Sequence, residues 1–246
     1  MQFITWINRS RHFIKCYTKY KIYNGSANVH PFKLIYLNPK SIDRHYSNKP
    51  PFPNGPRALG YIKSGEWDHK DVEPLSQKLK FKAITERFFE QKSWDETELF
   101  DFFRKEFKEK TIVDECRDMK QLKERYSKID KLYEKLRDEG YREYSHTALN
   151  YIYVDIDRHG GFIFVAREGA HRIALCQLLE IPLIPVMVRV RHTKWMEKRR
   201  EVFEKIQSNK GIKTLRQDLV DHPDMQDLIR PDKVVRISLK KLLFPN

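Results

Sequence analysis

A regular apolar repeat near the middle of the chain constrains the fold more than any other feature. Its members are spaced by three or four residues, so a helix would place all of them on one face. They are Met119, Leu122, Tyr126, Ile129, Tyr133 and Leu136. Gly140 then predicts the end of this helix. Because the repeat spans only about three heptads, we expect it to pack against the sheet of its own domain, with a coiled-coil dimer as the alternative.

The residues after this helix are typical of strands, a turn and a second helix. Residues 151–157 and 162–165 are separated by the turn signal Arg158-His159-Gly160-Gly161, which predicts a β-hairpin. A short apolar helix is expected over residues 173–179 and a further strand over 184–190. This order of elements predicts an α/β (α+β) fold with a small mixed sheet flanked by helices.

Further elements are expected on the N-terminal side of this core. Residues 32–37 form a short apolar run that predicts a strand, whereas four prolines within residues 49–56 exclude regular structure there. A helical pattern covers about residues 74–110, and a capping box with Ser93 as the N-cap and Glu96 three residues later lies inside it.

The distribution of charge divides the chain into a basic leader and one domain. Residues 1–49 carry nine of the 48 Lys and Arg residues but one of the 34 Asp and Glu residues, and the net charge of the chain is +14. We expect the leader at residues 1–30 and one domain at 31–246, with a helical insertion at about 74–118 and a C-terminal extension. Aromatic residues interleave with the basic ones at Trp6, Phe13, Tyr17, Tyr20 and Tyr23. This composition suits a nucleic-acid backbone or, at residues 1–21, an anionic membrane surface.

The cysteines and histidines exclude two kinds of site. Cys16, Cys116 and Cys176 lie far apart and form no C-x-x-C motif, so neither a disulfide framework nor a structural zinc site is expected. No histidine pair has the spacing of a zinc site beside Cys or acidic ligands. A reducing compartment suits this cysteine usage. Since the chain shows neither a signal peptide nor a membrane-spanning run, we expect a cytoplasmic protein.

One turn carries the most specific chemistry in the sequence. Glu168-Gly169-Ala170-His171-Arg172 lies where a predicted strand turns directly into a helix. The first N–H groups of a helix have no acceptor inside it, and the helix dipole favours an anion there. We therefore expect a phosphate site at Gly169, Ala170, His171 and Arg172, with Glu168 as a general base or a carboxylate beside a metal ion. The alternative is a tight turn in which His171 and Arg172 form internal hydrogen bonds.

A second group of residues could contribute to a ligand site. Arg57, Lys63, Trp67 and Asp68 combine two cations, an aromatic ring and a carboxylate, which a nucleotide or sugar-phosphate site would use. We expect the cations to lie near the anion-binding turn and Asp68 to be a second candidate for catalysis. The alternative is that Trp67 belongs to the core and Asp68 caps a helix.

Three segments of this region resemble the core of the ParB/sulfiredoxin superfamily. The first ends the predicted helix, the second contains the Gly169 turn, and the third is the closing strand. They are KLYEKLRDEG at residues 131–140, EGAHRIAL at 168–175 and IPLIPVMV at 181–188. The resemblance covers about 60 of the 246 residues. Members of the superfamily include CTP-dependent DNA clamps, ATP-using sulfiredoxins and a free serine kinase, which hold nucleotide phosphates at this turn.

The resemblance implies that Gly169, His171 and Arg172 bind the phosphates of a nucleotide such as ATP or CTP. Phosphoryl transfer or nucleotide hydrolysis would follow, with Mg2+ offsetting the phosphate charge. Sulfiredoxins carry their reactive cysteine where this chain has Ala170, which excludes reduction of a sulfinic acid by that route. Two further functions stay open from the residues alone. One is a nucleic-acid-binding or nuclease-like protein that grips a backbone phosphate at the same turn, and the other is an accessory protein on an anionic membrane. Whether the protein is an enzyme also stays open, as does its oligomeric state.

Overall fold

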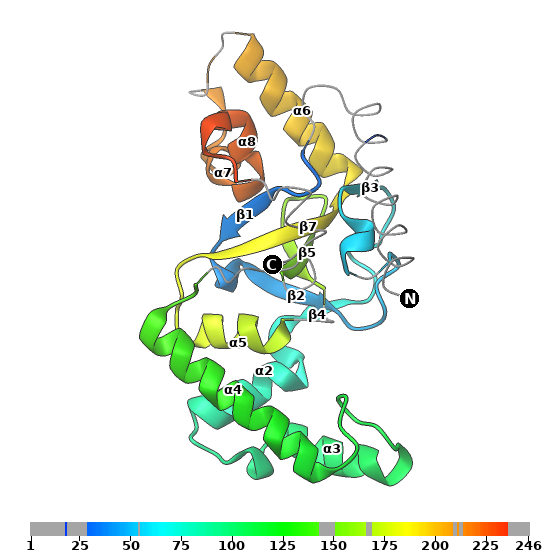
Figure 1. Cartoon of the computed structure of the whole chain (residues 1–246). Helices are drawn as coiled ribbons and strands as arrows, with labels where there is room; N and C mark the ends of the chain where they lie inside the picture. Colours follow the sequence, from blue (N-terminus) through cyan, green and yellow to red (C-terminus); the bar gives the residue numbers. More distant parts are fainter. Residues whose placement is uncertain are drawn as a thin grey trace.

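A seven-stranded mixed sheet runs through the middle of the molecule (Figure 1). The computed structural model describes residues 18, 29–53, 55–142, 151–165, 169–208, 211 and 214–235. The strands are β1 (Leu34–Leu37), β2 (Ile42–Tyr46), β3 (Tyr61–Lys63), β4 (Val72–Pro74), β5 (Ile152–Ile156), β6 (Phe162–Phe164) and β7 (Ile184–His192). Their order is β1-β7-β5-β6-β2-β4, and β3 also pairs with β7. The predicted α/β (α+β) class with a mixed sheet flanked by helices is therefore confirmed.

Strand β7 pairs with three other strands of the sheet. All nine of its residues are buried. It pairs in parallel with β5, antiparallel with β1, and in parallel with β3 beyond the end of β1. Because both faces of β7 and β5 are covered, both strands are apolar along most of their length instead of alternating with polar residues.

Two apolar clusters form on opposite faces of the sheet. Val186 and Val188 of β7 belong to the larger cluster, beneath the helices, whereas the intervening Met187 belongs to the smaller one. This separation follows from the alternation of side chains along a strand. The smaller cluster also contains Leu59 and Trp67, which come from the irregular segment between β2 and β4.

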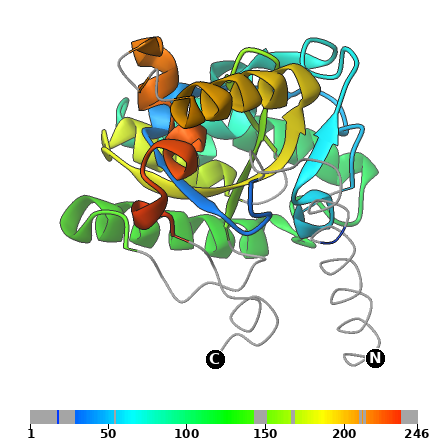
Figure 2. The same ribbon diagram turned by 90° about the horizontal axis from the view of Figure 1, so that it is seen from above.

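The helices gather at two ends of the molecule. Figure 1 shows α2, α3, α4 and α5 at one end of the molecule and α6, α7 and α8 at the other, and Figure 2 also separates α4 from α6. Their bounds are α2 (Leu79–Phe88), α3 (Glu98–Glu109), α4 (Met119–Glu139), α5 (Ala170–Leu178), α6 (Thr193–Gln207), α7 (Gln217–Asp221) and α8 (Gln226–Ile229). Among the described residues, no helix combines the length and apolar character that crossing a membrane requires.

The apolar repeat predicted near the middle of the chain forms α4, which ends at Gly140 with a φ of 69°. The repeat packs within the chain, as expected, but its main partners are helices instead of the sheet. The Tyr126 ring meets those of Trp94 and Phe103, and Tyr133 stacks on Phe88 at 4.1 Å between ring centres. The aromatic residues of the predicted insertion thus cover the repeat before it can reach the sheet.

Candidate functional site

The predicted anion-binding turn is a left-handed glycine at the start of α5. Gly169 is the N-cap residue with a φ of 94°, and no side chain caps the helix there. The first helical hydrogen bond joins the N–H of Ile173 to the carbonyl of Gly169 at 2.9 Å. The N–H groups of residues 170–172 therefore have no acceptor within α5. A Cβ on Gly169 would lie 3.1 Å from Ile152, so glycine suits this position both for its φ and for its size.

Arg172 turns back over the same glycine. Its Nη2 and Nε atoms lie 3.5 and 3.9 Å from the place where a Gly169 Cβ would be. Within the part of the chain that the structure describes, the Arg172 guanidinium makes no hydrogen bond and no ion pair, and the residue is partly exposed. A cation beside the positive end of a helix, without a carboxylate partner among these residues, favours an anionic ligand.

The His171 side chain lies in a different environment from the one predicted. Its ring meets the Tyr126 ring of α4 edge-on at 5.3 Å, and its Nε2 atom is buried without a hydrogen-bond partner. Burial lowers the pKa of His171 to about 3, so the ring is neutral at pH 7. The side chain therefore belongs to the interface between α5 and α4 and adds no positive charge to the turn. The backbone N–H of His171 stays at the start of the helix.

A strained acidic turn that the sequence analysis missed packs beside His171. Asp114 and Glu115 both have a positive φ, 47° and 67°. Asp114 is held by Lys80 at 2.6 Å and by the Tyr126 hydroxyl, which donates to it at 3.2 Å. Burial alone would raise the pKa of Asp114, but Lys80 and Arg125 hold it below its usual value. No local pattern signals this arrangement, because its partners come from α2 and α4.

Of the two predicted catalytic carboxylates, Asp68 lies within the described residues. Glu168 lies outside the described residues. Asp68 is buried. It accepts a hydrogen bond from the backbone N–H of Arg158 at 3.0 Å, and two more from the Arg158 guanidinium, from Nε at 2.8 Å and from Nη2 at 2.6 Å. Burial alone would raise the pKa of Asp68, but these hydrogen bonds hold it at about 2. Asp68 therefore anchors the turn between β5 and β6 and is a poor general base.

The second predicted group does not lie near the Gly169 turn. Trp67 is 8% exposed, packs between Phe52 and His192, and donates a hydrogen bond from Nε1 to the carbonyl of Lys63. Trp67 is therefore a core residue, which was the alternative interpretation. The side chains of Arg57 and Lys63 are exposed.

Strand register shows how far apart the two groups are. Lys63 pairs with His192 at the end of β7, whereas Ile152, which touches Gly169, pairs with Val186 near its start. Six residues of strand separate these two positions, about 20 Å. Trp67 also belongs to the smaller apolar cluster and α5 to the larger one, on opposite faces of the sheet. Ala58, next to Arg57, belongs to the smaller cluster as well. The expectation that Arg57 and Lys63 lie near the turn is thus wrong.

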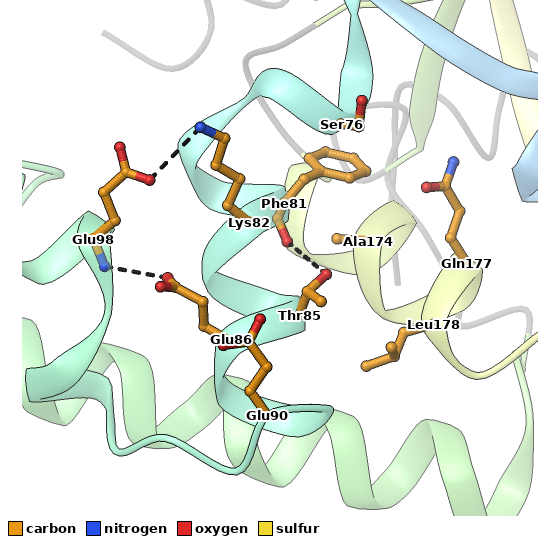
Figure 3. A pocket seen from close by; sticks show the side chains of 10 residues that line it. All are labelled: Ser76, Phe81, Lys82, Thr85, Glu86, Glu90, Glu98, Ala174, Gln177 and Leu178. Atoms are coloured by element: carbon orange, nitrogen blue, oxygen red, sulfur yellow. Dashed lines mark hydrogen bonds and ion pairs between the residues drawn. The ribbon is translucent and has the colours of Figure 1, made fainter.

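A cleft of about 400 Å³ opens between α2 and α5 (Figure 3). Its lining residues are Ser76, Phe81, Lys82, Thr85, Glu86, Glu90, Glu98, Ala174, Gln177 and Leu178. Lys82 pairs with Glu98 at 3.6 Å, and Glu86 accepts a hydrogen bond from the Glu98 backbone N–H at 3.1 Å. Because three glutamates and one lysine line this cleft, it is unsuited to a phosphate group.

The described residues contain neither a group of side chains suited to a metal ion nor most of the excess positive charge of the chain. Within the described ranges, no three His, Cys, Asp or Glu side chains gather as a metal site would require. Eleven of the 48 Lys and Arg residues, but only two of the 34 Asp and Glu residues, lie outside the described part. Most of the excess positive charge therefore comes from residues outside it.

The segments that resemble the ParB/sulfiredoxin core correspond to the end of α4, the start of α5, and the β7 region. Membership of the superfamily stays a prediction. Comparison with protein-family models, with curated proteins and with solved structures finds no match for this chain.

Proposed function

We propose that the start of α5 binds the phosphate group of a nucleotide or of another phosphorylated ligand. The observation that carries this proposal is the Arg172 guanidinium, which lies back over Gly169 without a hydrogen-bond or ion-pair partner among the described residues. The N–H groups of residues 170–172 and the positive end of the α5 dipole would face the same anion. Arginine can give two parallel hydrogen bonds to one phosphate.

Each residue of the turn has a separate role in this proposal. Gly169 allows the anion to approach the backbone, Arg172 supplies the charge, and His171 contributes its backbone N–H alone. Mg2+ bound with a nucleotide takes most of its ligands from phosphate and water, so one carboxylate suffices on the protein side. Glu168, next to the turn in sequence, is the proposed residue for that contact or for a general base. Asp68 is not proposed for either role, since its carboxylate already accepts hydrogen bonds from the Arg158 guanidinium.

The experiment is a ligand titration of the full chain with ATP and with CTP, each with and without Mg2+. Arg172→Ala should weaken binding by roughly ten- to a hundred-fold, because hydrogen bonds to charged groups contribute about 1.5–3 kcal/mol. Arg172→Lys should restore part of the affinity, since an ammonium lacks the planar fork. Arg200→Ala removes the same charge from an exposed site on α6 and should leave the affinity unchanged.

Calorimetry for the affinity and a melting curve on each variant separate binding from folding. If Arg172→Ala binds nucleotide as tightly as the wild type but melts at a much lower temperature, Arg172 has a structural role and the proposed site is wrong.

A further inference from the structure

A buried cluster of cations lies at the opposite end of the molecule from α5. Lys33 precedes β1, Arg191 belongs to β7, and Trp195 and Arg199 belong to α6. All four side chains are at most 3% exposed. We call this group, with the Trp195 indole N–H, the cationic socket. Residues distant in sequence build it, and Figure 1 shows α7 and α8 lying over this part of the molecule.

The carboxylate of Asp224 fills the cationic socket. Arg191 binds it with two hydrogen bonds, Nε to Oδ2 at 2.9 Å and Nη2 to Oδ1 at 2.7 Å. The Trp195 Nε1–H donates to Oδ2 at 3.0 Å, and the Lys33 ammonium donates to the Asp224 carbonyl at 2.8 Å. Asp224 itself is fully buried. This is the planar, two-point arrangement that recognises a carboxylate.

A second carboxylate three residues later completes the neutralisation. Asp227 pairs with Lys33 at 2.7 Å and with the Arg199 Nη2 at 2.9 Å. All the ion pairs that Lys33 and Arg199 make among the described residues involve Asp224 or Asp227. The negative charge of the socket thus comes from one short stretch of chain, whereas its positive charge comes from the body of the fold.

The segment that carries these two acids is held by their ion pairs and by apolar packing. Met225 belongs to the larger apolar cluster, and four partly buried residues of the segment pack against that cluster: Leu215, Leu219, Leu228 and Ile229. In the described range 214–235, only Asp224 and Met225 are buried. Its helices α7 and α8 have five and four residues, too short to be stable alone. His222 adds a hydrogen bond from Nε2 to the carbonyl of Gly160 at 2.9 Å. A short segment with two paired acids and one fully buried apolar residue has the kinds of contact that a bound acidic peptide makes.

We infer that the cationic socket is a carboxylate-binding site for an acidic peptide, and that residues 214–235 are its intramolecular occupant. The recognised partner is a short segment of helical turns with two carboxylates three residues apart, matching Asp224 in a 3-10 turn and Asp227 in α8. A protein segment with this pattern would compete with the chain's own residues for Lys33, Arg191 and Arg199.

The test uses the full chain with Asp224→Ala and Asp227→Ala together, which removes both carboxylates from the socket. A fluorescent peptide with the sequence of residues 220–230 should then bind saturably, as measured by anisotropy. The same peptide with the aspartates at positions 224 and 227 changed to asparagine should bind at least ten-fold more weakly. A matched variant with Asp218→Ala and Asp221→Ala loses two exposed acids of the same segment and should not bind the peptide, because its socket stays filled.

Hydrogen exchange on the wild-type chain gives a second measurement that does not depend on the folding of the variant. Excess peptide should increase exchange in residues 217–229, and the asparagine peptide should not. Equal binding of the two peptides, or unchanged exchange together with no binding to a folded double variant, would overturn the inference. If the double variant unfolds, the exchange result alone decides.

Discussion

The start of α5 and the cationic socket both bring positive groups together, yet they differ in what neutralises them. At α5 the charge comes from Arg172 and from backbone N–H groups, and no described carboxylate pairs with Arg172. In the socket, Asp224 and Asp227 of the same chain pair with Lys33 and Arg199. The two regions therefore respond differently to substitution: stability should depend on the acids of the socket, and ligand affinity on Arg172.

The largest expected effect is loss of the socket carboxylate. Asp224→Ala should lower the free energy of unfolding by about 3–5 kcal/mol, because it leaves buried cations without their partner. Asp218→Ala, in the same segment but exposed, should change it by less than about 0.5 kcal/mol. Urea unfolding of both variants measures the difference. Equal stability of the two would mean that the socket does not need its carboxylate, and the contrast with α5 would disappear.

A smaller loss of stability is expected from a substitution in the turn before α5. Gly169→Ala should destabilise by about 1–3 kcal/mol, since a side chain there is strained at a φ of 94° and approaches Ile152 at 3.1 Å. Gly65→Ala provides the matched control, because Gly65 has a φ of 97° but no atom within 4 Å of an added Cβ. The difference between the two variants in thermal unfolding isolates the contact with Ile152. A smaller loss for Gly169→Ala than for Gly65→Ala would contradict the close packing of the turn.

The smallest expected effect is a change in pH dependence at His171. Its pKa is lowered from 6.5 to about 3 by burial, so the unfolded chain binds a proton more readily than the folded one between these values. The stability contributed by the neutral ring is complete above pH 6.5 and is lost as the pH falls from 6.5 towards 3. His171→Phe should therefore flatten part of this fall in melting temperature.

His159→Gln, at an exposed turn position, is the control for His171→Phe and should leave the slope as in the wild type. An unchanged slope in His171→Phe would show that the ring is not held neutral by the fold.

Local pattern accounts for most of the elements found. The run at residues 32–37 contains β1, the hairpin lies between β5 and β6, and the turn at Gly169 starts α5. The capping box predicted at Ser93 is present, since the Glu96 carboxylate accepts a hydrogen bond from the Ser93 backbone N–H at 2.8 Å. This capping box begins a 3-10 turn, however, and Thr97 is the residue that caps α3. These features depend on neighbours within a few residues, which a sequence displays directly.

Relations between distant segments were harder to predict. The partner of the α4 repeat was expected to be the sheet, and Arg57 and Lys63 were expected near the turn. Both expectations failed. The types of the residues do not reveal which element packs on the apolar face of a helix, or near which end of a strand a loop lies. Trp67 suits a ligand site or a core equally well by composition, and only its contacts with Phe52 and His192 decide.

By itself the sequence determined the order and kind of the elements and the glycine that starts α5. The tertiary structure alone decided that Lys33 meets Asp224, 191 residues later, and that a strained Asp114 turn packs beside His171. The physical reason is the range of the forces involved. Helix and strand periodicity, caps and turns are set by contacts within a few residues, whereas a buried ion pair forms only after the sheet has brought separate segments of the chain together.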